Sequence, residues 1–314
     1  MEYQVWVNGT YHPRSQATLS FMDRGLRSSD VIFDTSRTFN GSIYRLRRHI
    51  ERLGRSLAYM RLDPGYSLNE IEALTLEVAA RNEPLRPPGD DYFITQIITR
   101  GHGFRANLAT EPTVAIWIDP ITWSIFAPLY ERGVHLIIPK IRAYSPDQVD
   151  PKIKHYNRLN FVLAELEVTD VDPDAFALLV DRAGNVAEAV NIGNIFIVTD
   201  GVLRTPSDRS VLQGVSRETV LELAADLAIP AREEDLQPYD VYTADEAFVT
   251  NSNHCICPVG RVDHRPIGAG VPGPVTAKLL AAWSDRVGLD VVRQIREQAT
   301  RSGAVDATVT GRPA

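Results

Sequence analysis

The 314-residue chain has little lysine and no long apolar run. Only four of its 33 basic residues are lysines: Lys140, Lys152, Lys154 and Lys278. Because arginine stays charged in proteins, chemistry that needs a deprotonatable amine has few candidates. No stretch approaches the roughly 18 apolar residues of a membrane-spanning helix, and residues 1–10 lack the basic and apolar regions of a signal peptide. We therefore expect a cytoplasmic protein with no membrane partner.

The chain also lacks an excess of positive charge and has few cysteines. The net charge of −7 argues against a nucleic acid or an anionic membrane as partner, although it permits a local basic pocket for a small anion. The two cysteines, Cys255 and Cys257, stand one residue apart in an apolar stretch, which is typical of a strand and predicts reduced thiols. No cysteine or histidine spacing predicts a metal site, and no glycine-rich nucleotide loop stands in the strand–helix context that ATP or NAD requires.

Hydrophobic periodicity predicts an α+β chain. We expect helices over residues 45–60, 67–81, 156–168, 216–227 and 274–284, and strands over 4–7, 30–39, 92–99, 114–118, 133–140, 175–181, 194–199 and 248–259. In the third helix, Leu159, Leu163 and Leu166 form the predicted apolar face. The predicted domains are residues 1–120, a small N-terminal α+β domain, and residues 133–295, joined by a linker over 121–132 and followed by a flexible tail over 296–314.

Lys154 lies between a loop and an apolar helix, within Asp150-Pro151-Lys152-Ile153-Lys154-His155-Tyr156-Asn157. A lysine in a partly dry site can be deprotonated and form an imine, whereas a solvated surface lysine is the ordinary alternative. Glu188 follows a turn and precedes the apolar strand 194–199. Such an acid is either a solvated charge at a strand end or the partner of a cation such as a pyridinium nitrogen.

Two further features suit an anion but are individually weak. Gly214 leads directly into the helix 216–227, so free N–H groups and the helix dipole would face an anion, unless the glycine is an ordinary cap. Arg52 lies on the helix 45–60, where a solvated charge is the alternative.

Taken in order, these motifs resemble those of the class IV (fold-type IV) aminotransferases, which include branched-chain, D-amino-acid and (R)-amine transaminases. The likeness runs through nearly all of residues 5–284. The matching segments are His49-Ile50-Glu51-Arg52-Leu53, Lys154 with Asn157, Ala187-Glu188 before Asn194-Ile195-Phe196, Leu212 to Arg217, Ile256-Cys257-Pro258-Val259, and Gly273-Pro274-Val275-Thr276.

The resemblance implies a homodimer that binds pyridoxal 5′-phosphate (PLP) between a smaller N-terminal α/β domain and a larger barrel-like domain. It assigns the Schiff base with PLP to Lys154 and the ring nitrogen to Glu188. It assigns the remaining cofactor contacts to Arg52, Asn157, Val215, Ser216 and Ser252, and substrate binding to Phe33, Arg37, Arg105, Asn107 and Asn253. One departure is an extra residue between Glu188 and Asn194, with Asn191 in place of a small residue, so we expect a reshaped loop there.

The implied reaction is a ping-pong transamination in which Lys154 acts as general base and acid. Ser29-Asp30 followed by Phe33-Asp34 looks like the (R)-amine enzymes, and the loop 99–107 resembles (R)-amine and D-amino-acid enzymes, where an arginine like Arg105 grips a carboxylate. The alternative for Arg105 is a solvated loop residue, and Asn107 stands where D-amino-acid enzymes have histidine.

The sequence therefore predicts transfer from an (R)-amine or D-amino acid to a 2-oxo acid such as pyruvate or 2-oxoglutarate. Three alternatives stay open. They are a branched-chain L-amino-acid aminotransferase, a PLP lyase resembling aminodeoxychorismate lyase, and a non-catalytic protein that binds PLP or another metabolite.

Overall fold

The computed structural model describes residues 2–309 and divides the chain into two compact units. The first comprises Met1–Ile121 with Ile153–Arg158, and the second comprises Thr122–Lys152 with Leu159–Ala314. A short stretch of the chain, residues 153–158, therefore belongs to the first unit although the second unit precedes and follows it in sequence.

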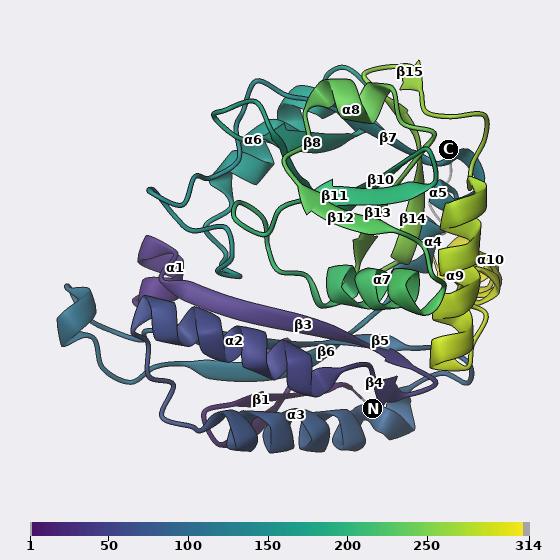
Figure 1. Ribbon diagram of the computed structural model, residues 1–314. Helices are drawn as coiled ribbons and strands as arrows, with labels where there is room; N and C mark the ends of the chain where they lie inside the picture. Colours follow the sequence, from purple (N-terminus) through teal and green to yellow (C-terminus); the bar gives the residue numbers. More distant parts are fainter. Residues whose placement is uncertain (1, 310–314) are drawn as a thin grey trace. The chain divides into compact units, whose positions relative to one another are not determined.

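The first unit is a six-stranded antiparallel sheet in the order β2-β1-β6-β5-β3-β4, with helices α2 and α3 on one face (Figure 1). Its strands are β1 Gln4–Val7, β2 Thr10–Pro13, β3 Val31–Phe39, β4 Ser42–Ile43, β5 Tyr92–Thr99 and β6 Val114–Pro120. Its α-helices are α1 Arg24–Ser28, α2 Leu46–Met60 and α3 Leu68–Asn82, and its 3₁₀ turns are η1 Arg14–Gln16, η2 Glu83–Leu85 and η3 Ala106–Leu108.

The core of this unit lies between the sheet and the two long helices. Ile50 and Leu53 recur on one side of α2 and pack with Ile94 and Ile98 of β5, all of them fully buried. Helix α3 begins at a capping box in which the Ser67 hydroxyl accepts from the Glu70 N–H and the Glu70 carboxylate accepts from the Ser67 N–H. Periodic apolar residues and a cap thus account for both helices.

The second unit contains a closed six-stranded barrel, because β9 pairs with both β8 and β10 in the order β10-β13-β14-β7-β8-β9. The barrel strands are β7 Val134–Ile137, β8 Phe176–Val180, β9 Val186–Ala189, β10 Gly193–Thr199, β13 Glu246–Asn251 and β14 Cys255–Val262. Strands β11 Val202–Pro206 and β12 Ala231–Glu234 extend the sheet beyond β10, and β15 Arg265–Pro266 pairs with β14. The helices are α4 Trp123–Phe126, α5 Leu129–Arg132, α6 Leu159–Thr169, α7 Val215–Asp226, α8 Pro238–Tyr242, α9 Pro274–Val287 and α10 Val291–Val309.

The predicted α+β class and the barrel-like second part are confirmed, and several element boundaries differ. The helix predicted from residue 156 begins at Leu159, after an extended segment in which His155 pairs with Ile32 of β3. Its predicted apolar face is wrong: Leu159, Leu163 and Leu166 are 66%, 47% and 57% exposed, and the buried residues of α6 are Ala164 and Val168.

Three other segments also differ from their predicted structure. The single strand expected over 248–259 is two strands, β13 and β14, joined by a turn. The segment predicted as a linker contains α4 and α5, with Trp123 and Tyr130 buried. Most of the predicted tail belongs to α10, and residues 310–314 lie outside the described part of the chain.

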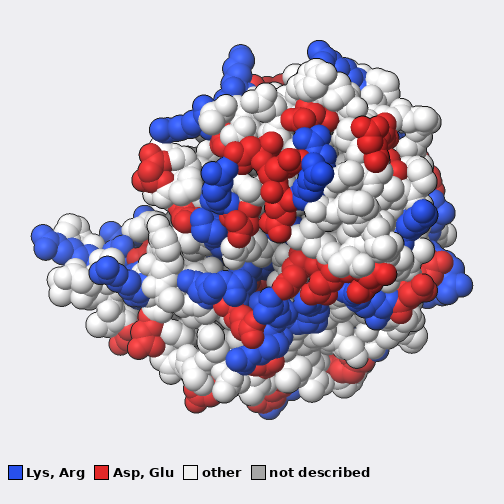
Figure 2. Space-filling view, viewed as in Figure 1, with Lys and Arg blue, Asp and Glu red and all other residues white. Residues whose placement is uncertain are grey.

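Surface charge and cysteine placement follow the composition. Basic and acidic side chains are interspersed on the face shown in Figure 2. Both cysteines are buried on β14, and neither forms a disulfide. Among the described residues, no helix is long and apolar enough to cross a membrane.

Candidate functional site

A buried ionic cluster joins β3 to α2 in the first unit. Alternation along β3 directs Asp34 toward α2, where His49 and Arg52 stand three residues apart on the same side of the helix. Asp34 accepts from Arg52 Nε at 2.8 Å and Arg52 Nη2 at 2.7 Å, and its Oδ1 lies 2.7 Å from His49 Nδ1. Arg52 is thus a buried, oriented guanidinium and not a solvated helix charge.

Charges inside this cluster are strongly coupled. Burial opposes ionisation of Asp34, but Arg52 and His49 outweigh it and hold the pKa of this carboxyl below its ordinary value. Burial also lowers the pKa of His49, an effect that the neighbouring Asp34 only partly offsets. The cluster at neutral pH is therefore an ionised carboxylate and guanidinium with a neutral imidazole.

Lys154 lies on the extended segment that returns to the first unit. His155 forms an antiparallel bridge with Ile32, the Phe33 N–H donates to Lys154 O at 3.0 Å, and the Lys154 N–H donates to Ser56 Oγ at 3.3 Å. Backbone pairing with β3 and a contact with α2 therefore fix this lysine, which stands outside the helix that follows it. Lys154 is half-buried.

The Lys154 amine lies above an aromatic ring. Its Nζ is 4.5 Å from the centroid of Phe33, and the same ring stacks on Tyr156 with centroids 3.9 Å apart and planes 7° apart. The Arg158 guanidinium lies 5.0 Å from the Phe33 centroid. Burial, with the charges of Arg158 and Lys154, lowers the pKa of His155 to about 4. His155 is therefore neutral at pH 7.

In the second unit, the N-terminus of α7 has the features of an anion site. Its N-cap is Gly214, which supplies no side chain to the first N–H groups of the helix. A Cβ on Gly214 would lie 2.2 Å from Oδ1 of Asn194, so only glycine lets the backbone approach so closely. Val215 and Ser216, the predicted phosphate contacts, form the buried first turn.

Asn194 connects this helix start to the barrel strands. Its Nδ2 donates to Leu212 O at 3.0 Å, and on β10 it is paired with Glu188 of β9 on one side and Thr250 of β13 on the other. Asn194 thus lies between a predicted cofactor contact, Glu188, which is its strand neighbour, and Gly214, which packs on its side chain and directly precedes the predicted contacts Val215 and Ser216.

The turn between β13 and β14 carries Ser252 and Asn253. Asn251 Oδ1 accepts from the N–H groups of Asn253 at 2.8 Å and His254 at 3.2 Å, which gives the turn its shape. Ser252 is half-buried at the tip.

The loop with the extra residue also has a defined structure. Val190, Asn191 and Ile192 join β9 to β10, with Asn191 at φ 63° and Gly193 at φ 96°. A Cβ on Gly193 would lie 2.2 Å from Thr250 O. A glycine is therefore required where the hairpin enters β10.

The predicted substrate contacts occupy three kinds of position. Phe33 lies beneath Tyr156 and Lys154. Arg37 is buried on β3 with its guanidinium 4.4 Å from the Phe39 centroid. The others predicted in the first unit, Arg105 and Asn107, are exposed on the loop between β5 and β6. Asn157, a predicted cofactor contact, is also exposed, and its N–H donates to His155 Nδ1 at 3.1 Å.

In the first unit, Lys154 lies over Phe33 and its backbone contacts α2, while Arg52 of α2 pairs with Asp34 of β3. In the second unit, Glu188 and the start of α7, which carries Val215 and Ser216, both lie beside Asn194. Sequence reasoning missed Asp34 and Asn194 as the residues that organise these groups. Both stand within family-like motifs, Phe33-Asp34 and Asn194-Ile195-Phe196, which is the signal that could have found them.

Comparison with known proteins gives one consistent family. Residues 31–262 match the family model described as amino-transferase class IV. The chain is 33% identical to a putative branched-chain-amino-acid aminotransferase of Methanocaldococcus jannaschii, covering 90% of this chain and 96% of the relative. It is 30% identical to a D-alanine aminotransferase of Staphylococcus aureus (strain N315), covering 88% and 95%.

Solved structures agree. The branched-chain amino acid aminotransferase of Escherichia coli superposes with a TM-score of 0.84 at 26% identity, covering 91% of this chain and 94% of that one. The branched-chain aminotransferase of the thermophilic archaeon Thermoproteus uzoniensis, solved with norvaline, superposes with a TM-score of 0.82 at 26% identity, covering 92% and 96%.

Proposed function

We propose a function for this chain that starts from its family: it belongs to the class IV aminotransferases. The proposal is that it uses PLP to move an amino group from an (R)-amine or D-amino acid to a 2-oxo acid. The family relationship establishes an aminotransferase, with amino and oxo acids as the substrate classes. The donor, the acceptor, the site residues and a homodimeric assembly are parts of the proposal.

The residues present fit PLP, which offers an aldehyde, a phosphate and a ring nitrogen. Lys154 would hold the aldehyde carbon, since its backbone is fixed by β3 and its amine lies over Phe33. Val215 and Ser216, at the uncapped N-terminus of α7, would hold the phosphate with Arg52, Ser252 and Asn157. Glu188 would hold the ring nitrogen. The close packing of Gly214 on Asn194 is the observation that supports a backbone phosphate cradle.

When bound, PLP supplies an electron sink for negative charge at the substrate carbon. The Nζ of Lys154 would take the proton from that carbon and deliver it to the cofactor carbon that carried the aldehyde, and it would move a proton the opposite way when the 2-oxo acid reacts. The carboxylate of Glu188 would keep the ring nitrogen protonated. Arg52 would contribute a fixed positive charge, because Asp34 restrains its guanidinium through two nitrogens.

The exposed position of Arg105, on the loop between β5 and β6, favours a substrate that carries a carboxylate. Arg105 lies exposed before η3, and among the side chains that the structure describes its guanidinium has no acidic partner. A guanidinium can bind a carboxylate through two parallel hydrogen bonds. The relatives named as branched-chain enzymes favour the second candidate, an L-branched-chain donor, with the same acceptor class.

The test is the absorbance spectrum of PLP-loaded protein titrated separately with D-alanine, (R)-1-phenylethylamine and L-leucine. Loss of the lysine-bound PLP band with D-alanine or the (R)-amine supports the proposed donor class. A response to L-leucine alone favours the second candidate. Lys154→Ala should abolish the band, while Lys152→Ala keeps it, because Lys152 pairs with Asp150 at 2.9 Å on the surface. A band that survives Lys154→Ala overturns the cofactor assignment.

A further inference from the structure

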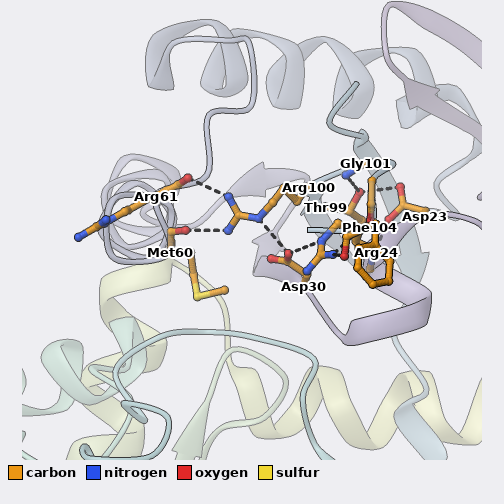
Figure 3. Close-up of polar contacts among 11 residues, drawn as sticks. Asp23, Arg24, Asp30, Met60, Arg61, Thr99, Arg100, Gly101 and Phe104 are labelled. Atoms are coloured by element: carbon orange, nitrogen blue, oxygen red, sulfur yellow. Dashed lines mark hydrogen bonds and ion pairs between the residues drawn. The ribbon is translucent and has the colours of Figure 1, made fainter. Parts of the chain in front are cut away.

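Two buried carboxylates, Asp23 and Asp30, lie at the base of the loop that carries Arg105 (Figure 3). Asp23 holds the strand ends on either side of the loop: its Oδ2 accepts from the hydroxyls of Thr99 at 2.7 Å and Thr113 at 2.9 Å. Its Oδ1 accepts from the Gly25 N–H at 2.6 Å, which caps α1. Asp23 therefore fixes where the loop begins and ends.

Asp30 holds two arginines on one oxygen. Its Oδ2 accepts from Nε of Arg24 and from Nε of Arg100, each at 2.9 Å. Both arginine side chains are only 15% exposed and the Asp30 side chain is 8% exposed. In so dry a place the two positive charges would repel one another strongly without the carboxylate between them. Asp30 is therefore what allows both arginines to occupy this position.

Each arginine then reaches a different part of the backbone. Arg100 donates to the carbonyls of Met60 at 2.7 Å and Arg61 at 2.8 Å, at the C-terminal end of α2, where carbonyls lack helical partners and the dipole favours a cation. Arg24 Nη1 donates to the carbonyls of Gly103 and Phe104, both at 3.2 Å. The cluster thus ties the end of α2 to the two residues directly before Arg105. Figure 3 shows Asp30 between Arg24 and Arg100, with Arg100 reaching Met60 and Arg61.

The loop needs such support because its own backbone is permissive. Gly101 has φ 74° and Gly103 has φ 146°, and glycine adopts such angles without fixing a single conformation. A Cβ on Gly101 would lie 2.1 Å from Glu111 O, so the glycine is also required for the loop to close. A paired contact between His102 and Thr110 forms the neck, and beyond it Phe104 is 89% exposed. Side-chain hydrogen bonds to carbonyls 103 and 104 therefore restrain the tip.

We propose that Asp30, acting through Arg24, is a positioning residue that holds Arg105 for the carboxylate of the 2-oxo acid. The inference rests on the proposed function, in which Arg105 grips that carboxylate. Asp30 itself touches no substrate in this account. It determines how strongly the enzyme distinguishes a charged acceptor from a neutral one of the same shape.

The experiment compares pyruvate with pyruvamide, its uncharged analogue, as acceptor for the holoenzyme. The measured quantity is the ratio of kcat/KM for pyruvate to kcat/KM for pyruvamide, in Asp30→Asn, Arg24→Lys, Arg105→Ala and the double variant Asp30→Asn/Arg105→Ala. We expect Asp30→Asn and Arg24→Lys each to lower the ratio about tenfold, through KM for pyruvate, because a displaced guanidinium loses its alignment. Asp174→Asn is the matched control, since Asp174 pairs with Arg132 at 2.6 Å on an exposed surface.

Non-additivity separates positioning from a general structural effect. If Asp30 acts through Arg105, Asp30→Asn should not lower the ratio further once Arg105 is alanine. A ratio that falls in Arg105→Ala but not in Asp30→Asn or Arg24→Lys overturns the inference and leaves the role of Arg105 intact. A ratio unchanged in Arg105→Ala overturns the role of Arg105 and the inference with it.

A second measurement does not depend on activity. Chymotrypsin should cut after the exposed Phe104 faster in Arg24→Lys and Asp30→Asn than in the wild type or Asp174→Asn, with the fragments identified by mass. Equal cutting rates in all four proteins would mean that the cluster does not restrain the loop, and would overturn the inference even if one variant folds poorly.

Discussion

Replacing Asp34 by asparagine tests the buried cluster at the centre of the first unit. Asp34 is fully buried and its oxygens take four hydrogen-bond contacts: from the Thr35 N–H at 2.8 Å, from two nitrogens of Arg52, and with the His49 ring. Asparagine keeps the shape but removes the charge, and its amide group presents hydrogens where one oxygen accepted. The substitution therefore leaves the Arg52 guanidinium buried without its counter-ion.

The size of the effect follows from that stranded charge. Removing one partner of a buried ion pair costs about 3–5 kcal/mol, whereas replacing both partners by apolar groups is far less harmful. We expect Asp34→Asn to lower the free energy of unfolding by about 3 kcal/mol, and Asp34→Leu/Arg52→Met to lower it by less than either Asp34→Leu or Arg52→Met alone.

The assay is urea unfolding followed by tryptophan fluorescence and far-ultraviolet circular dichroism, at several pH values. Because Arg52 and His49 hold the pKa of Asp34 below its ordinary value, the stabilisation is present above the unfolded pKa of about 3.9 and is lost as pH falls below it. The difference in free energy of unfolding between the wild type and Asp34→Asn should therefore become smaller at acid pH. If Asp34→Asn lowers the free energy of unfolding by less than about 1 kcal/mol at pH 7, the idea of a charged buried pair is refuted. It is also refuted if the double variant loses as much unfolding free energy as the two single variants together.

Three further outcomes are expected. Gly214→Ala should weaken PLP binding about tenfold in an absorbance titration, because the added Cβ meets Asn194 Oδ1 at 2.2 Å, and Asn194→Ala in the same chain should restore part of the affinity. The urea concentration at the unfolding midpoint of the wild type should decrease as the pH is lowered from about 6.5 to 4, because burial and nearby cations lower the pKa of His155 to about 4. His155→Gln should make the midpoint depend less on pH over this range. Glu246→Gln should lower the free energy of unfolding in urea by about 2 kcal/mol, because the buried carboxylate of Glu246 caps α9. A decrease of less than half that amount would contradict the capping role of Glu246.

Local pattern was enough to predict the elements that carry their own periodicity. The apolar spacing of α2 and the β-rich run of β5 locate these elements to within a residue, because α2 buries one continuous face and β5 is a largely buried run of strand-forming residues. The family motifs predicted Lys154 and Glu188 as candidate residues, and these assignments stay predictions. What the motifs did not predict is which residues hold them in place.

The missing information was tertiary. Asp34 and Arg52 meet because β3 lies beneath α2, and Asn194 matters because β10 runs between β9 and β13. Neither neighbourhood is visible in the spacing of residues along the chain. The same limit explains α6: the stripe of leucines was recognised, but periodicity alone does not say whether a stripe faces a core or the surface.

The bridge between Ile32 and His155 has a consequence for how the chain can be made or divided. A nascent chain that has emerged only to residue 121 has all six strands of the first sheet, but it lacks the segment 153–158 that pairs with β3. The first unit therefore completes itself only after part of the second has been synthesised. A gene fragment cut after residue 121 would encode Arg52 without Lys154, so a split version of this protein should be divided beyond residue 158 instead.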